Sequence, residues 1–131
     1  MNNIDGWKVV NLTAHDINII LQNGKVVEIE NDWTFRVKEE VKTMGFVGGI
    51  RVIKKKFTGI TYKDLEKLKE IINKNDVDIV SAISGKFVKE LYEDGHLSRE
   101  EANKVYIIGN TLRDDKGRVV GADALMNILY L

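Results

Sequence analysis

The chain has 131 residues, which is enough for one domain with its own hydrophobic core. Its 20 basic residues balance its 20 acidic ones, so no overall field would draw it to DNA or to a membrane surface. The lack of cysteine excludes disulfides and thiolate metal sites, and two histidines far apart in sequence make zinc improbable. We therefore expect a single domain over residues 1–131, without a cofactor.

The N-terminal residues show neither the basic start nor the apolar run of a signal peptide. No window of the chain is long and apolar enough to span a membrane. These two observations favour a cytoplasmic protein.

The first half of the chain predicts antiparallel hairpins. Ile17–Leu21 alternates apolar and polar residues, and Lys25–Glu30 reads as its partner strand. Asn23-Gly24 between them predicts a type I′ turn, in which both residues take positive φ. Gly48-Gly49 predicts a second turn before the strand Ile50–Phe57.

The second half predicts alternating helices and strands. A helix capped by Thr61 ends near Asn75, and the buried strands Val77–Val80 and Val105–Ile108 follow, with helices between them. A last amphipathic helix is expected within Ala122–Leu131. The pattern predicts an α+β fold with a largely antiparallel sheet built from hairpins and two to four helices packed on it. The two buried strands are expected to run parallel, through a crossover.

One candidate binding site lies where the Val77–Val80 strand turns into a helix. Free N–H groups and the positive end of the helix dipole suit an anion such as phosphate there. Ser84, Gly85 and Lys86 would contact it. The structural alternative is that Ser84 only caps the helix. The stretch is not a Walker A loop, because Phe87 stands where a magnesium-binding hydroxyl belongs.

A second candidate site is the stretch around the turn at residues 115–117. Arg113 and Arg118 flank this turn, and Asn110 and Thr111 lie beside them. Two guanidinium groups suit a phosphate or nucleotide ligand. The alternative is a hairpin that pairs its arginines with its own aspartates.

Two further groups carry weaker signals. Lys54-Lys55-Lys56 is typical of a solvated strand edge, but with Arg51 and Arg36 it would also suit a phosphate-binding surface. Thr13, His15 and Asp16 would suit proton transfer, although such clusters more often form turns that bond to nearby backbone.

Several short stretches resemble a group of small phage, prophage and bacterial proteins that open with Val-Asn-Leu-Thr-Pro-His. The residues that carry the resemblance are Val10–His15, with Ala14 in place of proline, Gly49–Ile53, Ile79–Ser81 and Arg113–Gly121. The group has no assigned activity, so no catalytic residue is carried over. Its setting implies a phage protein in the host cytoplasm, of the size of anti-defence sponges that sequester cyclic ADP-ribose isomers.

We therefore expect a non-enzymatic, homo-oligomeric protein that sequesters a phosphorylated, nucleotide-like signalling molecule as a phage anti-defence protein. Its expected ligand-binding residues are Asn110, Thr111, Arg113 and Arg118, with Ser84, Gly85, Lys86 or Arg51 as a second wall. An aromatic residue such as Phe57 or Phe87 would stack a base, although the helical spacing of Phe87 favours a place in the core. Two alternatives remain open. One is an inhibitor that binds a host protein through an exposed strand edge, and the other is a small nucleotide hydrolase that uses His15 and Asp16.

Overall fold

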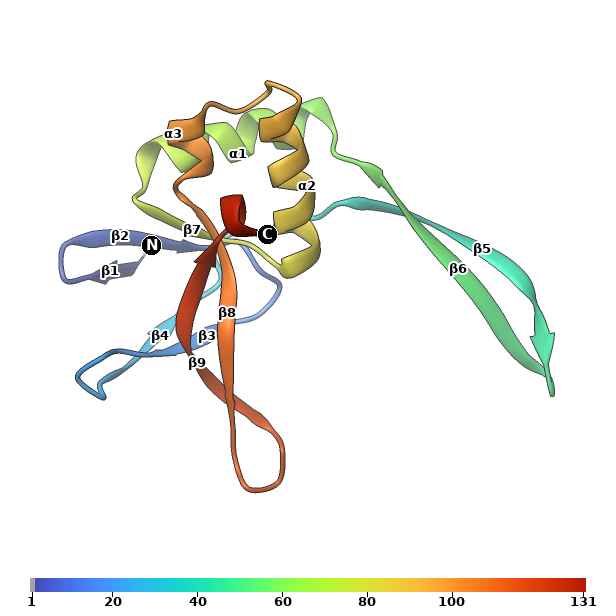
Figure 1. Ribbon diagram of the computed structural model, residues 1–131, viewed down its shortest axis with the longest axis horizontal. Helices are drawn as coiled ribbons and strands as arrows, with labels where there is room; N and C mark the ends of the chain where they lie inside the picture. Colours follow the sequence, from blue (N-terminus) through green and yellow to red (C-terminus); the bar gives the residue numbers. More distant parts are fainter. Residues whose placement is uncertain (1) are drawn as a thin grey trace.

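A computed structural model describes residues 2–131 and shows a curled sheet, a layer of helices on it and one long projecting hairpin (Figure 1). The strands in chain order are β1 (Asn2–Ile4), β2 (Trp7–Asn11), β3 (Ile17–Ile20), β4 (Val26–Ile29), β5 (Lys38–Val47), β6 (Ile50–Gly59), β7 (Val77–Ile79), β8 (Val105–Arg113) and β9 (Val119–Asn127). The helices are α1 (Tyr62–Lys74), α2 (Ala82–Glu93), α3 (Arg99–Ala102) and the short 3-10 helix η1 (Ile128–Tyr130).

Seven strands form one sheet in the order β1-β2-β7-β8-β9-β3-β4, while β5 and β6 pair with each other. Of the strand pairs in residues 2–131, four are antiparallel and three are parallel. The predicted α+β fold is confirmed, and so is the parallel pairing of β7 with β8. The strands β2, β7 and β8 form the parallel centre of the sheet.

Helix caps account for where the helices begin. The Thr61 side chain accepts the N–H of Asp64, and Ser98 forms a capping box with Glu101, as their spacing predicts. The cap of α2 is Ser81, whose hydroxyl accepts the N–H of Ser84 at 3.2 Å. The prediction that Ser84 is the cap is therefore wrong by one turn. Ser81 takes that role because its backbone is extended, as an N-cap requires, and its hydroxyl reaches the N–H of Ser84.

The turns divide into two kinds. At Gly48-Gly49 both residues have positive φ, so this two-residue turn suits the twist of β5 and β6. At the β3–β4 turn only Gly24 does, and its N–H donates to Leu21 O, so the expected type I′ turn at Asn23-Gly24 is wrong. A three-residue loop with one left-handed glycine connects these strands instead.

The chain ends in a strand where a helix was expected. Leu125, Ile128 and Leu129 have helical spacing, but residues up to Asn127 pair with β8 as β9. The Asn127 side chain then accepts the N–H of Leu129 and starts the single turn of η1. Cross-strand pairing overrides the local periodicity here.

Apolar side chains gather on both faces of the sheet. On the helix side, Val80 and Val105 of the sheet region belong to one buried cluster with Leu68 of α1 and Val88 of α2. On the other side the sheet curls back, so that Ile29 of β4 joins a second cluster with β2 and β7. A bridge between Asn11, the last residue of β2, and Asn31, just after β4, holds these two parts of the curled sheet together.

The hairpin β5–β6 leaves the body next to α2 and extends away from it (Figure 1). We call residues 38–59 the arm. At its base the chain passes the start of α2, and this junction forms the site described next.

Candidate functional site

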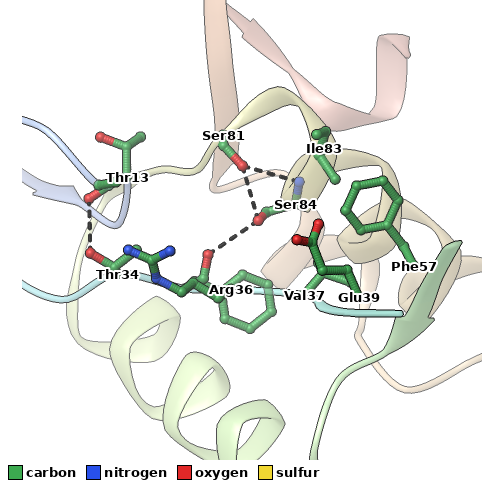
Figure 2. A pocket seen from close by; sticks show the side chains of 11 residues that line it. Thr13, Thr34, Arg36, Val37, Glu39, Phe57, Ser81, Ile83 and Ser84 are labelled. Atoms are coloured by element: carbon green, nitrogen blue, oxygen red, sulfur yellow. Dashed lines mark hydrogen bonds between the residues drawn. The ribbon is translucent and has the colours of Figure 1, made fainter. Parts of the chain in front are cut away.

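A crevice of about 350 Å³ lies at the base of the arm, beyond the carboxyl ends of the parallel strands β2 and β7. Ligands of α/β sheets commonly occupy this position. The side chains that give the crevice its chemistry are Thr13, Thr34, Arg36, Glu39, Phe57 and Ser81. They come from the loop after β2, the segment before β5, the base of the arm and the cap of α2 (Figure 2).

A chain of hydroxyl groups forms one wall. The Ser81 hydroxyl donates to Ser84 Oγ at 3.0 Å, and the Ser84 hydroxyl donates to the carbonyl oxygen of Phe35 at 3.1 Å. The Phe35 N–H in turn donates to the Leu12 carbonyl at 3.0 Å. These bonds fasten the segment that carries Arg36 to both α2 and the β2 loop.

Asn11 organises the opposite wall. Its side chain is fully buried, and its Nδ2 donates to the carbonyls of His15 and Ile29 at 2.7 and 3.0 Å. Its Oδ1 accepts the Thr13 N–H at 2.9 Å. Because all these bonds fix one loop, Thr13 and Ala14 are held in place on the crevice.

Two features of the crevice attract anions. The Arg36 guanidinium extends toward Thr13 and Thr34 (Figure 2), and among residues 2–131 no carboxylate forms an ion pair with it. The N–H groups of Ala82 and Ile83, at the start of α2, have no partner within the helix. The first turn of α2 contains no acidic residue, and among the described residues the one carboxylate that lines the crevice beside it is that of Glu39.

The side of the crevice between α2 and the base of the arm is apolar and carries one carboxylate. Phe57 packs edge-on against Phe87 with ring centroids 5.9 Å apart, and its position beside Ile83 leaves an apolar wall (Figure 2). The Glu39 carboxylate lies between this wall and the start of α2, with Lys55 Nζ 3.8 Å away. The crevice therefore offers cationic, hydroxyl, carboxylate and aromatic groups within one small volume.

Of the residues predicted around α2, only Ser84 lines this crevice. Its hydroxyl is already engaged with Phe35 O, so it holds the wall in place. Gly85 is buried because α2 approaches β8 closely there, and a Cβ at Gly85 would lie 2.6 Å from Ile107 Cγ2. Lys86 is exposed on the surface of the helix.

The predicted arginine hairpin adopts the self-contained arrangement. Arg118 Nε lies 2.9 Å from Asp114 Oδ2, and Arg113 donates to the Gly117 carbonyl at 2.8 Å. Hydrogen bonds from the backbone and side chain of Arg118 lower the pKa of Asp114 below its usual value. Asn110 donates to Asp123, away from both arginines.

The two predicted walls do not meet. Arg113 stands seven residues beyond Tyr106, the β8 residue paired with Ile79, which is roughly 20 Å along the strand at ~3.3 Å per residue. Thr111 lines a different, smaller hollow of about 200 Å³ between β3 and β9. Arg51 lies near the tip of the arm, paired with Phe46.

His15 and Asp16 form a turn. The His15 carbonyl accepts from Asn11, and the Asp16 carboxylate accepts the Asn31 N–H at 2.9 Å. Both side chains are exposed, and no hydrogen bond or ion pair joins them in the part of the chain that the structure describes.

The sequence patterns missed Thr34 and Glu39, and they named Arg36 and Phe57 as candidates without placing them in one site, because the signals that join them are three-dimensional. Arg36 stands in a segment without helix or strand periodicity and is a candidate only together with the lysine run. Glu39 and Phe57 are paired across the β5–β6 hairpin, and this pairing brings both side chains to the crevice. Counting residues outward from the Gly48-Gly49 turn is the step that would have paired them.

Comparison with protein-family models, with curated proteins and with solved structures finds no match for this chain. In residues 2–131, no three His, Cys, Asp or Glu side chains stand close enough to hold a metal ion together. Within the same residues, no helix has the length and apolar character that crossing a membrane requires.

Proposed function

We propose that this protein binds a phosphorylated, nucleotide-like small molecule in the crevice and releases it unchanged. The observation that carries the proposal is the pairing of two anion-binding features in one hollow: the Arg36 guanidinium, which forms no ion pair within residues 2–131, and the open N-terminus of α2. Arginine binds phosphate oxygens through two parallel hydrogen bonds, and helix N–H groups add to this attraction.

The remaining groups suit the rest of a nucleotide. Glu39, Thr13 and Thr34 offer oxygens that accept or donate hydrogen bonds to ribose hydroxyls. The Phe57 ring and Ile83 offer an apolar wall for a base. The volume of about 350 Å³ lies at the lower end of the range for small-molecule sites. Cyclic ADP-ribose isomers belong to this ligand class, and sequestering them would give the protein the anti-defence role that its resemblance to phage proteins implies.

The test is native mass spectrometry of the protein with a panel of nucleotides, cyclic nucleotides and cyclic ADP-ribose isomers. We expect one member to add its own intact mass to the protein. The same ligand should raise the melting temperature, because binding to the folded state alone stabilises it. A ligand recovered with altered mass would show the hydrolase instead, and no adduct with any member would overturn the proposal.

Two arginine variants locate the site. Arg36→Ala should lower the affinity for the ligand by at least ~10-fold, since a hydrogen bond to a charged group is worth about 1.5–3 kcal/mol. Arg113→Ala is the matched control, because its side chain is also exposed and lies outside the crevice. The reverse result, with binding lost in Arg113→Ala and kept in Arg36→Ala, would return the site to the hairpin around residues 115–117.

A further inference from the structure

The arm exposes more apolar surface than a lone hairpin accounts for. Its two strands pair only with each other, yet seven large apolar side chains on it are exposed, with Phe46 at 69% and Ile50 at 71%. Together they expose on the order of 700 Å², divided about equally between the two faces of the hairpin, so each face alone offers an apolar surface of roughly 300 Å². The seven are Val41, Met44, Phe46, Val47, Ile50, Val52 and Ile53.

The register of the arm divides its side chains between two faces, because directly paired residues share a face and successive pairs alternate. One face continues from the crevice, and we call it the crevice face. From base to tip its pairs are Glu39/Phe57, Val41/Lys55, Thr43/Ile53 and Phe46/Arg51. The opposite face, which we call the lysine face, carries Glu40/Lys56, Lys42/Lys54, Gly45/Val52 and Val47/Ile50.

We propose that two copies of this chain dimerise by stacking their arms crevice face to crevice face, in opposite directions, about a two-fold axis. The axis would cross the arms midway between the Glu39/Phe57 and Phe46/Arg51 pairs, at the level of Lys42. The Glu39/Phe57 pair, at the base of each arm, then lies opposite the partner's Phe46/Arg51 pair, near the tip. The Val41/Lys55 pair lies opposite the partner's Thr43/Ile53 pair.

The crevice face is complementary to itself in this arrangement. With the arms opposed, each strand lies over its own copy, so Phe57 lies opposite the partner's Arg51, and Glu39 lies diagonally from that arginine, opposite the partner's Phe46. An acidic and aromatic pair thus faces a basic and aromatic pair at both ends, as an isologous interface requires. Between them, Val41 and Ile53 bury apolar surface against their counterparts.

The lysine face excludes the same arrangement. With the axis midway along its own four pairs, the Lys42/Lys54 pair would lie opposite the partner's Gly45/Val52 pair. Two ammonium groups would then be buried against apolar surface at each such contact with no carboxylate opposite them, which is strongly unfavourable. The charge pattern therefore selects one face of the arm for the second copy.

This dimer brings the partner's Arg51 to the edge of the crevice, because Glu39 and Phe57 line the crevice and also belong to the dimer interface. The dimer itself does not depend on a ligand. Only the role of the partner's Arg51 in binding rests on the proposed function. A dimer without ligand binding would refute the latter alone.

Analytical ultracentrifugation of the wild-type chain between 1 and ~100 µM tests the dimer, at concentrations chosen to bracket a micromolar dissociation constant. We expect a monomer–dimer equilibrium. Ile53→Glu should weaken it at least ~30-fold, since two carboxylates would be buried in each dimer. Val52→Glu is the matched control: it lies on the lysine face with nearly the same exposure, 40% against 38%, and should leave the dimer intact.

A charge exchange tests the opposed direction of the arms. Glu39→Arg and Arg51→Glu should each dissociate the dimer, because each places like charges at both ends of the interface. An equimolar mixture of the two variants should recover dimers, since a mixed dimer pairs the two substituted side chains at one end and keeps the native Glu39 and Arg51 pair at the other. The proposal fails if the wild-type chain stays monomeric, if Val52→Glu dissociates it as Ile53→Glu does, or if the mixture stays monomeric. A monomer that captures a different protein would point to the host-factor alternative.

Discussion

Asp78 is a carboxylate buried in the apolar centre of the sheet. It lies on β7 between Val10 of β2 and Val105 of β8, fully buried, and neither carboxylate oxygen has a hydrogen-bond partner in residues 2–131. Burial raises the pKa of this carboxyl to about 7, with Lys104 opposing the rise and Asp76 adding to it. The folded protein therefore holds a neutral acid at its centre below neutral pH.

This raised pKa predicts the direction in which stability changes with pH. Asp78 binds its proton more tightly in the folded state, so its contribution is fully present below pH ~4 and is lost as pH rises to about 7. Asp78→Asn should remove this loss and stabilise the protein at pH 8 by a few kcal/mol, with a smaller change at pH 5. Urea unfolding at the two pH values measures both effects.

The control for this experiment is Asp115→Asn, which neutralises an exposed carboxylate in the β8–β9 turn. It should leave the difference in unfolding free energy between pH 5 and pH 8 as in the wild type. An Asp78→Asn protein with the wild-type pH dependence would show that Asp78 remains charged in the folded state.

At the scale of elements, the approach of α2 to β8 depends on Gly85. In an ordinary helix interior, Gly→Ala stabilises by up to about 1 kcal/mol. Here the added Cβ would lie 2.6 Å from Ile107 Cγ2, so we expect Gly85→Ala to destabilise by ~1–2 kcal/mol. Thermal unfolding of the Gly85→Ala, Ile107→Ala and double variants measures the coupling. A Gly85→Ala protein as stable as the wild type would show that α2 shifts freely on the sheet.

Local signals predicted those elements whose ends depend on neighbouring residues. Thr61, Ser98 and Gly48-Gly49 set a cap, a capping box and a turn through bonds or dihedral angles within four residues. The β1–β2 hairpin has such a signal too, because Asp5-Gly6 forms its two-residue turn with positive φ at both residues. The end of the chain was misjudged because its helical spacing is outweighed by pairing with β8, a contact distant in sequence.

The site was less predictable than the fold for the same reason. Ser84 was recognised near the start of α2, but its role follows from a bond to Phe35, 49 residues away. Arg113 and Arg118 carry the strongest local pattern, and the structure shows that pattern satisfied within its own turn. Arg36 carries no local pattern, and its position follows from bonds that join three separate segments of the chain.

At the scale of the whole molecule, the crevice and the arm share Glu39 and Phe57, so ligand binding and dimerisation should be linked. If the partner's Arg51 adds to the crevice, the dimer binds the ligand more tightly than the monomer. Linkage then requires that each bound ligand strengthen the dimer by the same factor. We expect roughly 10- to 150-fold, since one hydrogen bond to a charged group is worth about 1.5–3 kcal/mol.

Ligand titrations at protein concentrations above and below the dissociation constant of the dimer measure this factor. Apparent affinity should fall on dilution in the wild-type chain. In Ile53→Glu, which stays monomeric, affinity should be low at every concentration, and in Val52→Glu it should follow the wild type. Equal affinity for monomer and dimer would contradict a ligand contact by the partner's Arg51. It would be compatible with ligand binding in the crevice and with the dimer.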